Sequence, residues 1–277
     1  MGLRINTNMA SISAQRALGV TKNNLDSNLR KLSSGERITR ASDDAAGLAI
    51  SEKLKAHIRG LRQAKRNSDD GISLIQTAEG GLNEISNIII RLRELAIQAA
   101  SDTVGDTERG FSNIEFKNLQ EEIQRISQGS EFNGRKLLDG TGGLVEIQVG
   151  IHNDPLNDRI AYDSTQTDST LENLGLLQEN IASKEGAQLS LSKLDDALVR
   201  INGTRANLGA LQNRLQSAST TIAISDENFS AANSRIRDVD VAAETADMAK
   251  NNILAQAGVS VLAQANQAPN FALKLLA

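Results

Sequence analysis

Few residues of this chain have the types and spacing that chemistry requires. The only histidines are His57 and His152, and there is no cysteine, which excludes disulfides, thiolate metal sites and a cysteine nucleophile. The adjacent carboxylates Asp43 and Asp44 could begin a metal site, but no further ligand lies at a suitable spacing. We interpret them, with Ser42 as the capping residue, as a helix start whose carboxylates lie at the positive end of the helix dipole.

Catalytic motifs are missing from the sequence. It contains no G-x-x-x-x-G-K, no H-E-x-x-H and no G-x-S-x-G. The two histidines are far apart in sequence and fall in different kinds of element, so we interpret His57 as a surface or seam-edge residue. The glycosylation motifs at 202–204 and 228–230 fall within a helical pattern and are interpreted as chance matches. The sequence therefore predicts no enzyme, no catalytic residue, no cofactor and no metal.

Composition favours packed helices. Only 2% of the 277 residues are aromatic, and 30 basic residues against 34 acidic ones give a net charge of −4. That balance lacks the basic footprint of a protein that binds nucleic acid or anionic lipid, so neither partner is expected. Residues 1–20 contain no apolar run, and we expect neither a cleaved signal peptide nor insertion into a membrane.

The most regular feature is a heptad repeat of apolar residues from Leu194 to Ala246. Such a repeat predicts a long helix whose apolar seam faces another helix. No proline interrupts the stretch, so we expect one helix of roughly 80 Å, at about 1.5 Å per residue. The residues of this seam are Leu194, Leu198, Ile201, Leu208, Leu211, Leu215 and Ile222.

A second heptad repeat runs from Leu61 to Ala99 and is expected to pack against the first. Its seam consists of Leu61, Ile75, Leu82, Ile85, Ile89 and Leu92. Gly80-Gly81 interrupts it at a cost of about 1 kcal/mol per glycine, which we interpret as a close approach or slight kink. A shorter helix is predicted from Glu108 to Gln128.

The two ends of the chain carry only thin apolar stripes on otherwise polar helices. The N-terminal helix is expected to end at Ser33-Ser34-Gly35-Glu36. Such helices are not stable alone and require a partner. The stripe residues are Ile5, Ile12, Leu18, Leu25, Leu29 and Leu32 at the N-terminal end, and Ile253, Val261, Leu273, Leu275 and Leu276 at the C-terminal end.

In the middle of the chain the apolar period changes to two. Residues 145–151 alternate apolar and polar, as in a strand with one buried face, and residues 159–163 can pair with them. A small β-hairpin region is predicted at about 142–165, and the polar stretch 163–170 is interpreted as a linker-like loop. The expected fold is mainly α, an elongated antiparallel helical bundle or coiled coil built from both chain ends.

Several short stretches, in order along the chain, resemble those of bacterial flagellins, in a short form that lacks the variable outer domains. The resemblance covers roughly residues 1–150 and 185–277. It is carried by Ile5-Asn-Thr-Asn8, Ser42-Asp-Asp-Ala-Ala-Gly-Leu-Ala-Ile-Ser51, Phe132-Asn-Gly134, Ile147-Gln-Val-Gly150, Ser234-Arg-Ile-Arg-Asp238 and Gln256-Ala-Gly-Val-Ser-Val-Leu-Ala-Gln-Ala-Asn266.

The resemblance implies a structural subunit that self-assembles into the helical flagellar filament, outside the cell, for swimming motility. Residues 1–42 and 240–277 would form the inner terminal-helix domain, and residues 43–239 the long-helix bundle with the hairpin. The subunit would leave the cell unfolded through the flagellar type III apparatus. Its implied partners are copies of itself, flagellar junction and cap proteins, and an export chaperone at the C-terminal segment.

The resemblance also implies a contact surface for the flagellin-sensing Toll-like receptor of a host. Its residues here are Arg91, Leu95 and Glu115. Two alternatives remain open: a hook–filament junction protein of the same architecture, and an enzyme inserted in a flagellin frame. The short centre of the chain and its lack of a metal-ligand cluster argue against the inserted enzyme.

Overall fold

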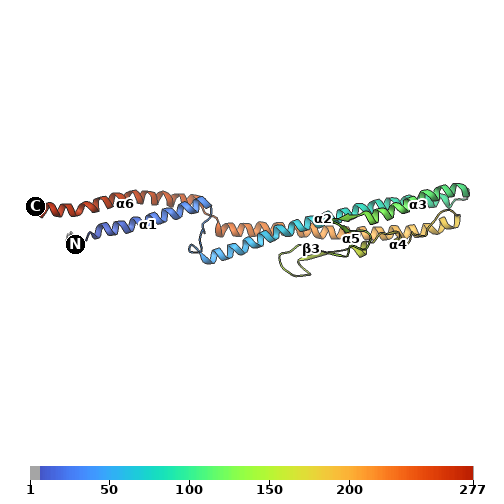
Figure 1. The fold of residues 1–277 in the computed structure, drawn as a ribbon, viewed down its shortest axis with the longest axis horizontal. Helices are drawn as coiled ribbons and strands as arrows, with labels where there is room; N and C mark the ends of the chain where they lie inside the picture. The colour runs from blue at the N-terminus through green and yellow to red at the C-terminus, as the bar shows by residue number, and fades with distance from the viewer. Residues whose placement is uncertain (1–6, 277) are drawn as a thin grey trace. The chain divides into compact units, whose positions relative to one another are not determined.

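The computed structural model describes residues 7–276, with side chains up to residue 267. It confirms a mainly α fold with a small β-hairpin region (Figure 1). The chain divides into two compact units, one of the residues up to Ala56 together with those from Asn228, the other of His57–Glu227. The main helices are α1 (Met9–Ser34), α2 (Ala45–Ala99), α3 (Asp106–Gly129), α5 (Lys184–Arg237) and α6 (Val241–Leu276).

The first helix break lies where the sequence predicts it, but the capping residue of the next helix is different. Gly35 ends α1 in the left-handed conformation, with φ of 71°. The prediction that Ser42 caps α2 is wrong, because the Asp44 side chain accepts the hydrogen bond from the Gly47 backbone N–H at 2.8 Å. Asp43 instead accepts from the backbone N–H of Arg40, at 2.9 Å, and so shapes the loop before the cap.

In the second unit α2 and α5 pack antiparallel. Contacting pairs show this, since the residue number on α5 falls as the residue number on α2 rises. The pairs are Arg62–Asp226, Asp69–Ser219, Glu79–Arg205 and Arg93–Asp195. Along this contact Leu61, Ile75, Leu82, Ile85, Ile89, Leu92, Leu194, Ile201, Leu208, Leu215 and Ile222 are buried, whereas Leu198 and Leu211 are half-buried. Helix α2 continues through Gly81, where an added Cβ would lie 2.7 Å from Leu138 Cδ1.

The expectation of one helix from Leu194 to Ala246 is wrong. Helix α5 ends at Arg237, whose carbonyl oxygen accepts from Arg37 N–H at 2.6 Å, and Val239 N–H donates to Gly35 at 3.0 Å. Asp240 then caps α6 by accepting from Ala242 N–H at 2.9 Å. These bonds satisfy the backbone groups at the break, so the helix ends although the apolar spacing continues.

The middle of the chain contains two antiparallel hairpins. The predicted one pairs β3 (Leu144–Gln148) with β4 (Arg159–Asp163), with Ile147 opposite Ile160 and both buried. The other pairs β1 (Glu131–Phe132) with β2 (Arg135–Lys136). Its two turn residues, Asn133 and Gly134, both have positive φ, as the tight hairpin turn requires.

The interpretation of 163–170 as a linker is wrong. This stretch forms a short 3₁₀ helix, η1 (Ser164–Thr167), before a single turn, α4 (Leu171–Leu174). Thr167 is buried, and its hydroxyl donates to the Leu137 carbonyl oxygen at 2.7 Å. Hydrogen bonds of this kind allow a Ser/Thr-rich segment to pack inside the protein.

Candidate functional site

Among the residues that the structure describes, no group of three or more His, Cys, Asp or Glu side chains could hold a metal ion. His57 and His152 form an edge-on contact, with their ring centroids 5.9 Å apart. The sequence did not predict this contact, because His57 lies on α2 and His152 lies in the loop after β3. Over the described range, no helix combines the length and apolar character needed to cross a bilayer.

A more informative feature is the pair of helices from the two chain ends. Helices α1 and α6 lie side by side and antiparallel (Figure 1), and we call them the terminal pair. Asn8 donates to the Ala265 carbonyl oxygen at 2.7 Å and the Ser11 hydroxyl donates to Asn266 at 2.7 Å. Near the other end of the pair the Lys31 ammonium lies 3.4 Å from a Glu244 carboxylate oxygen.

The terminal pair leaves large apolar side chains uncovered on both helices. Of the predicted stripe, Leu18, Leu25 and Leu32 are half-buried, whereas Ile12, Leu29, Ile253 and Val261 are exposed. Ile5 and the side chains of Leu273, Leu275 and Leu276 lie outside the described residues. Further exposed apolar residues are Met9, Val20, Leu254 and Val259. Large apolar residues therefore remain exposed on both helices of the terminal pair in a single chain.

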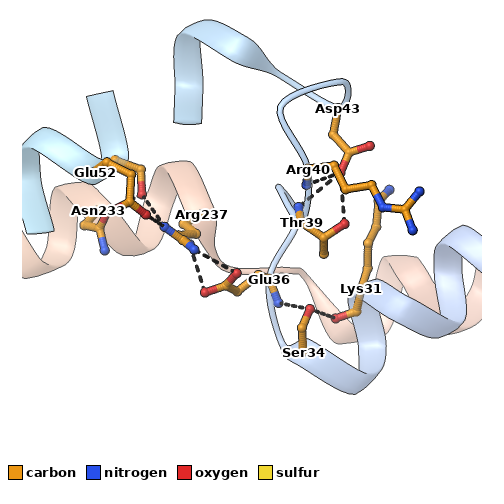
Figure 2. Close-up of polar contacts among 10 residues, drawn as sticks. Lys31, Ser34, Glu36, Thr39, Arg40, Asp43, Glu52, Asn233 and Arg237 are labelled. Atoms are coloured by element: carbon orange, nitrogen blue, oxygen red, sulfur yellow. Dashed lines mark hydrogen bonds and ion pairs between the residues drawn. The ribbon is translucent and has the colours of Figure 1, made fainter. Parts of the chain in front are cut away.

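A cluster of charged and polar side chains holds the helix ends of the first unit together (Figure 2). We call Glu36, Ser51, Glu52, Asn233 and Arg237 the polar junction. Arg237 Nε lies 2.8 Å from Glu36 Oε1, and its Nη1 contacts Glu52 at the start of α2. The Ser51 hydroxyl donates to the Asn233 side chain at 2.9 Å. One guanidinium thus joins the loop after α1, the first turns of α2 and the end of α5.

The residues of the predicted receptor surface lie near one another but not on one surface. Arg91 Nε donates to Glu115 Oε1 at 2.9 Å, and both side chains are about half exposed. Leu95 is only 3% exposed and therefore lies beneath the surface. The neighbouring exposed apolar residues Phe111 and Ile114, on α3, were not predicted as part of this surface.

Comparison with protein families gives matches over most of the chain. The model of the bacterial flagellin N-terminal helical region matches residues 5–142, and that of the C-terminal helical region matches residues 191–276. The chain belongs to the bacterial flagellin family. The resemblance seen in the sequence is thereby confirmed.

Individual flagellins match along nearly the whole chain. A flagellin of Halalkalibacterium halodurans is 46% identical over 98% of this chain and 99% of its own length. The flagellar filament 30.7 kDa core protein of Treponema maltophilum is 42% identical over 98% and 99%. The crystal structure of Bacillus cereus flagellin, 33% identical, covers 57% of this chain and 88% of that one with a TM-score of 0.51.

Proposed function

We propose that this flagellin-family chain is the structural subunit of the helical filament of the bacterial flagellum, and that it assembles with copies of itself outside the cell to form the propeller for swimming. The observation that carries the proposal is the terminal pair, whose exposed Met9, Ile12, Ile253 and Val261 would be covered only by other chains. The full-length similarity to a filament core protein supports the same role. A structural role requires no catalytic residue.

Residues 1–42 and 240–277 would form the innermost layer of this filament, and residues 43–239 the bundle around it. The helix breaks support this division, because α1 ends at Ser34 and α6 begins at Val241. The exposed apolar residues are large in both terminal helices, as an inner layer packed against copies on several sides requires.

The remaining partners are proposed from membership of the family. Delivery through the flagellar type III apparatus would present an unfolded chain, and an export chaperone would hold the C-terminal segment, whose Ile253, Leu254 and Val261 are exposed. Junction and cap proteins would meet the subunit at the two filament ends. A host Toll-like receptor would contact Arg91 and Glu115, with Leu95 supporting that surface from below.

Electron microscopy of the purified chain after salt-induced polymerisation tests the proposal. A filament subunit forms long filaments without other proteins. A hook–filament junction protein would add to the ends of hooks but form no long filaments of its own, and that result would overturn the proposal.

A further inference from the structure

The chain contains two Asn-Gly sequences, and the fold places them in different backbone settings. Asn133-Gly134 forms the two-residue turn between β1 and β2, whereas Asn202-Gly203 lies within α5. An asparagine followed by glycine readily loses its side-chain amide, because the unhindered glycine nitrogen can attack that amide. The two pairs therefore show what the fold adds to the same local chemistry.

Exposure to solvent does not distinguish the two pairs. Asn133, Gly134, Asn202 and Gly203 are all exposed. An added Cβ at either glycine would meet nothing within 4 Å, so both sites are open. Any difference in reactivity between the two asparagines must therefore come from the backbone.

The backbone nitrogen of Gly203 is held in place, and that of Gly134 is not. Inside an α-helix each N–H donates to the carbonyl oxygen four residues earlier, which keeps the Gly203 nitrogen away from the preceding side chain. The β1–β2 ladder closes at the pair Phe132–Arg135, so the turn lies outside it. Among the described residues, neither the Asn133 side chain nor the Gly134 N–H makes a hydrogen bond.

The β1–β2 hairpin is also short enough to open locally. Each strand has two residues, and a two-stranded hairpin is marginally stable at best on its own. The ion pair of Lys136 with Glu131, at 2.8 Å, is exposed and adds little. The base is fixed, because Leu137 and Leu138 are fully buried and the Leu137 N–H donates to the Ser130 carbonyl oxygen at 3.0 Å. The turn can therefore change its backbone angles while the rest of the protein stays folded.

We propose that Asn133 is a site of spontaneous deamidation in the folded chain and that α5 protects Asn202 from the same reaction. When the turn opens, the Gly134 nitrogen bonds to Asn133 Cγ and the bond from Cγ to Nδ2 breaks. The departing nitrogen takes up the glycine proton and leaves as ammonia. Water then opens the five-membered succinimide ring. Opening at the side-chain carbonyl gives aspartate, and opening at the main-chain carbonyl gives isoaspartate, whose main chain runs through the former side chain.

The two products should affect the hairpin differently. Asn133 and Gly134 have φ of 50° and 77°, and aspartate tolerates such a turn as asparagine does. Isoaspartate instead lengthens the main chain by one carbon atom within a two-residue turn. The strands then no longer keep Phe132 opposite Arg135, and the tip of the hairpin should become more open to proteases.

Tryptic peptides separate the two sites. Cleavage after arginine places Asn133 in the peptide 126–135 and Asn202 in the peptide 201–205. The full-length monomer is kept at mildly alkaline pH, which favours loss of the glycine proton, and is sampled over time. Mass spectrometry with fragmentation then measures deamidation of each asparagine, with a freshly purified sample as the reference for changes during digestion.

In the folded chain we expect Asn133 to deamidate about tenfold faster than Asn202, or more, because the turn opens far more often than the middle of α5. In urea, which removes both helix and hairpin, the two rates should agree within about threefold, since only the neighbouring side chains differ. A fresh Asn133→Asp chain adds the charge without lengthening the main chain. Its native cleavage after Arg135 should match that of the parent, whereas the isoaspartate form should be cut faster.

Two results overturn the proposal. Equally slow deamidation of Asn133 and Asn202 in the folded chain would show that the turn protects its asparagine as well as α5 does. A difference that persists unchanged in urea would show that the neighbouring side chains, and not the fold, decide which asparagine reacts.

Discussion

Arg109 donates its Nε hydrogen to the carbonyl oxygen of Ala99 at 2.8 Å and so closes the C-terminal end of α2. The same guanidinium donates to the Ser101 carbonyl oxygen at 2.9 Å and lies 2.7 Å from an Asp106 carboxylate oxygen. The last carbonyl groups of a helix have no partner within the helix. Arg109, which is 7% exposed, therefore satisfies the end of α2 from the first turn of α3.

We expect Arg109→Met to lower the free energy of unfolding by about 2–3 kcal/mol, because it leaves carbonyl groups at the end of α2 without their donor. Urea unfolding of the monomer, followed by circular dichroism, measures this. Arg125→Met is the matched control, since Arg125 is exposed and pairs with Glu122 one turn away; it should change stability by less than about 0.5 kcal/mol. Equal effects of the two substitutions would contradict the capping role.

Tyr162, the chain's single tyrosine, is expected to make the unfolding free energy fall as the pH rises in the alkaline range. Burial raises the pKa of its hydroxyl above the ordinary value, and the hydroxyl donates to the Leu137 carbonyl oxygen at 2.6 Å. The unfolded chain therefore loses this proton first, near pH 10, and the stability present below that pH declines as pH rises toward the folded pKa. Unfolding free energies measured from pH 9 to pH 11 should show the decline.

Tyr162→Phe is the control for that experiment, because lysines titrate in the same range. The phenylalanine chain should keep the background slope and lose the tyrosine contribution. At neutral pH its cost should be only about 1 kcal/mol, since Thr167 still donates to the Leu137 carbonyl oxygen at 2.7 Å. If the unfolding free energy fell equally with pH in both chains, the hydroxyl would ionise as readily in the folded protein as in the unfolded chain.

The geometry of the polar junction predicts which of its two carboxylates, Glu36 or Glu52, contributes more to stability. Glu36 offers both oxygens to Arg237, at 2.8 and 3.1 Å, and its side chain is 35% exposed, whereas Glu52 is 53% exposed. Glu36→Gln should therefore lower the temperature at which filaments dissociate more than Glu52→Gln does, because the better-solvated pair is more strongly screened. Light scattering on heated filaments at low and high salt measures both. The reverse order would place the main contact of Arg237 at Glu52.

Heptad spacing alone predicts the large residues of α5 that are most buried, but not that Leu198 and Leu211 are only half-buried. Leu194, Ile201 and Leu208 recur on one face of any α-helix, and the structure buries all three. The break after Arg237 follows a different rule. The apolar pattern continues through Ile236 and Val239, but the backbone there is held by the loop after α1, about two hundred residues earlier in the chain. A local pattern contains no information about such a partner.

The same limit explains why the sequence did not predict the burial of Leu95 and of residues near Tyr162. The stretch 163–170 is polar and resembles a linker, yet its Thr167 hydroxyl finds the Leu137 carbonyl oxygen, which only the folded chain brings close. Leu95 lies on a helix with apolar residues on more than one face. Sequence alone does not show that Leu95 is covered while Ile90 and Ile97 are left exposed.

Receptor recognition is predicted to depend on Arg91. Its side chain is half exposed and joined to Glu115 and Glu94, so Arg91→Ala should weaken signalling by the monomer while changing unfolding free energy by less than about 0.5 kcal/mol. Arg93→Ala is the control, because Arg93 is similarly exposed but pairs with Asp195 on α5. A receptor assay in which both variants signal like the parent would exclude this surface.

Leu95→Ala should act differently from Arg91→Ala. Because Leu95 is buried, its loss is expected to cost about 2–3 kcal/mol of stability. Signalling should fall only where the variant monomer is measurably unfolded, as urea unfolding under the conditions of the receptor assay would show. Full folding with lost signalling would instead mean that the side chain reaches the receptor.

Removal of both chain ends tests the assignment of layers. The seam between α2 and α5 carries large buried residues, whereas the terminal pair leaves Ile12, Leu29, Ile253 and Val261 exposed in a single chain. Ordering about eighty end residues costs on the order of 1–2 kcal/mol each, so we expect these helices to become stable only where neighbouring subunits cover them. Assembly should accordingly be limited by nucleation and proceed at a growing end.

A chain of residues 43–239 should therefore be a soluble, mostly helical monomer that unfolds cooperatively and forms no filaments under conditions in which the full chain does. Circular dichroism and analytical ultracentrifugation measure the two properties separately. Normal filaments from the shortened chain would show that the ends are not the inner layer. An unfolded shortened chain would show that the contact between α2 and α5, with its ion pairs Arg62–Asp226 and Arg93–Asp195, is insufficient without the terminal pair.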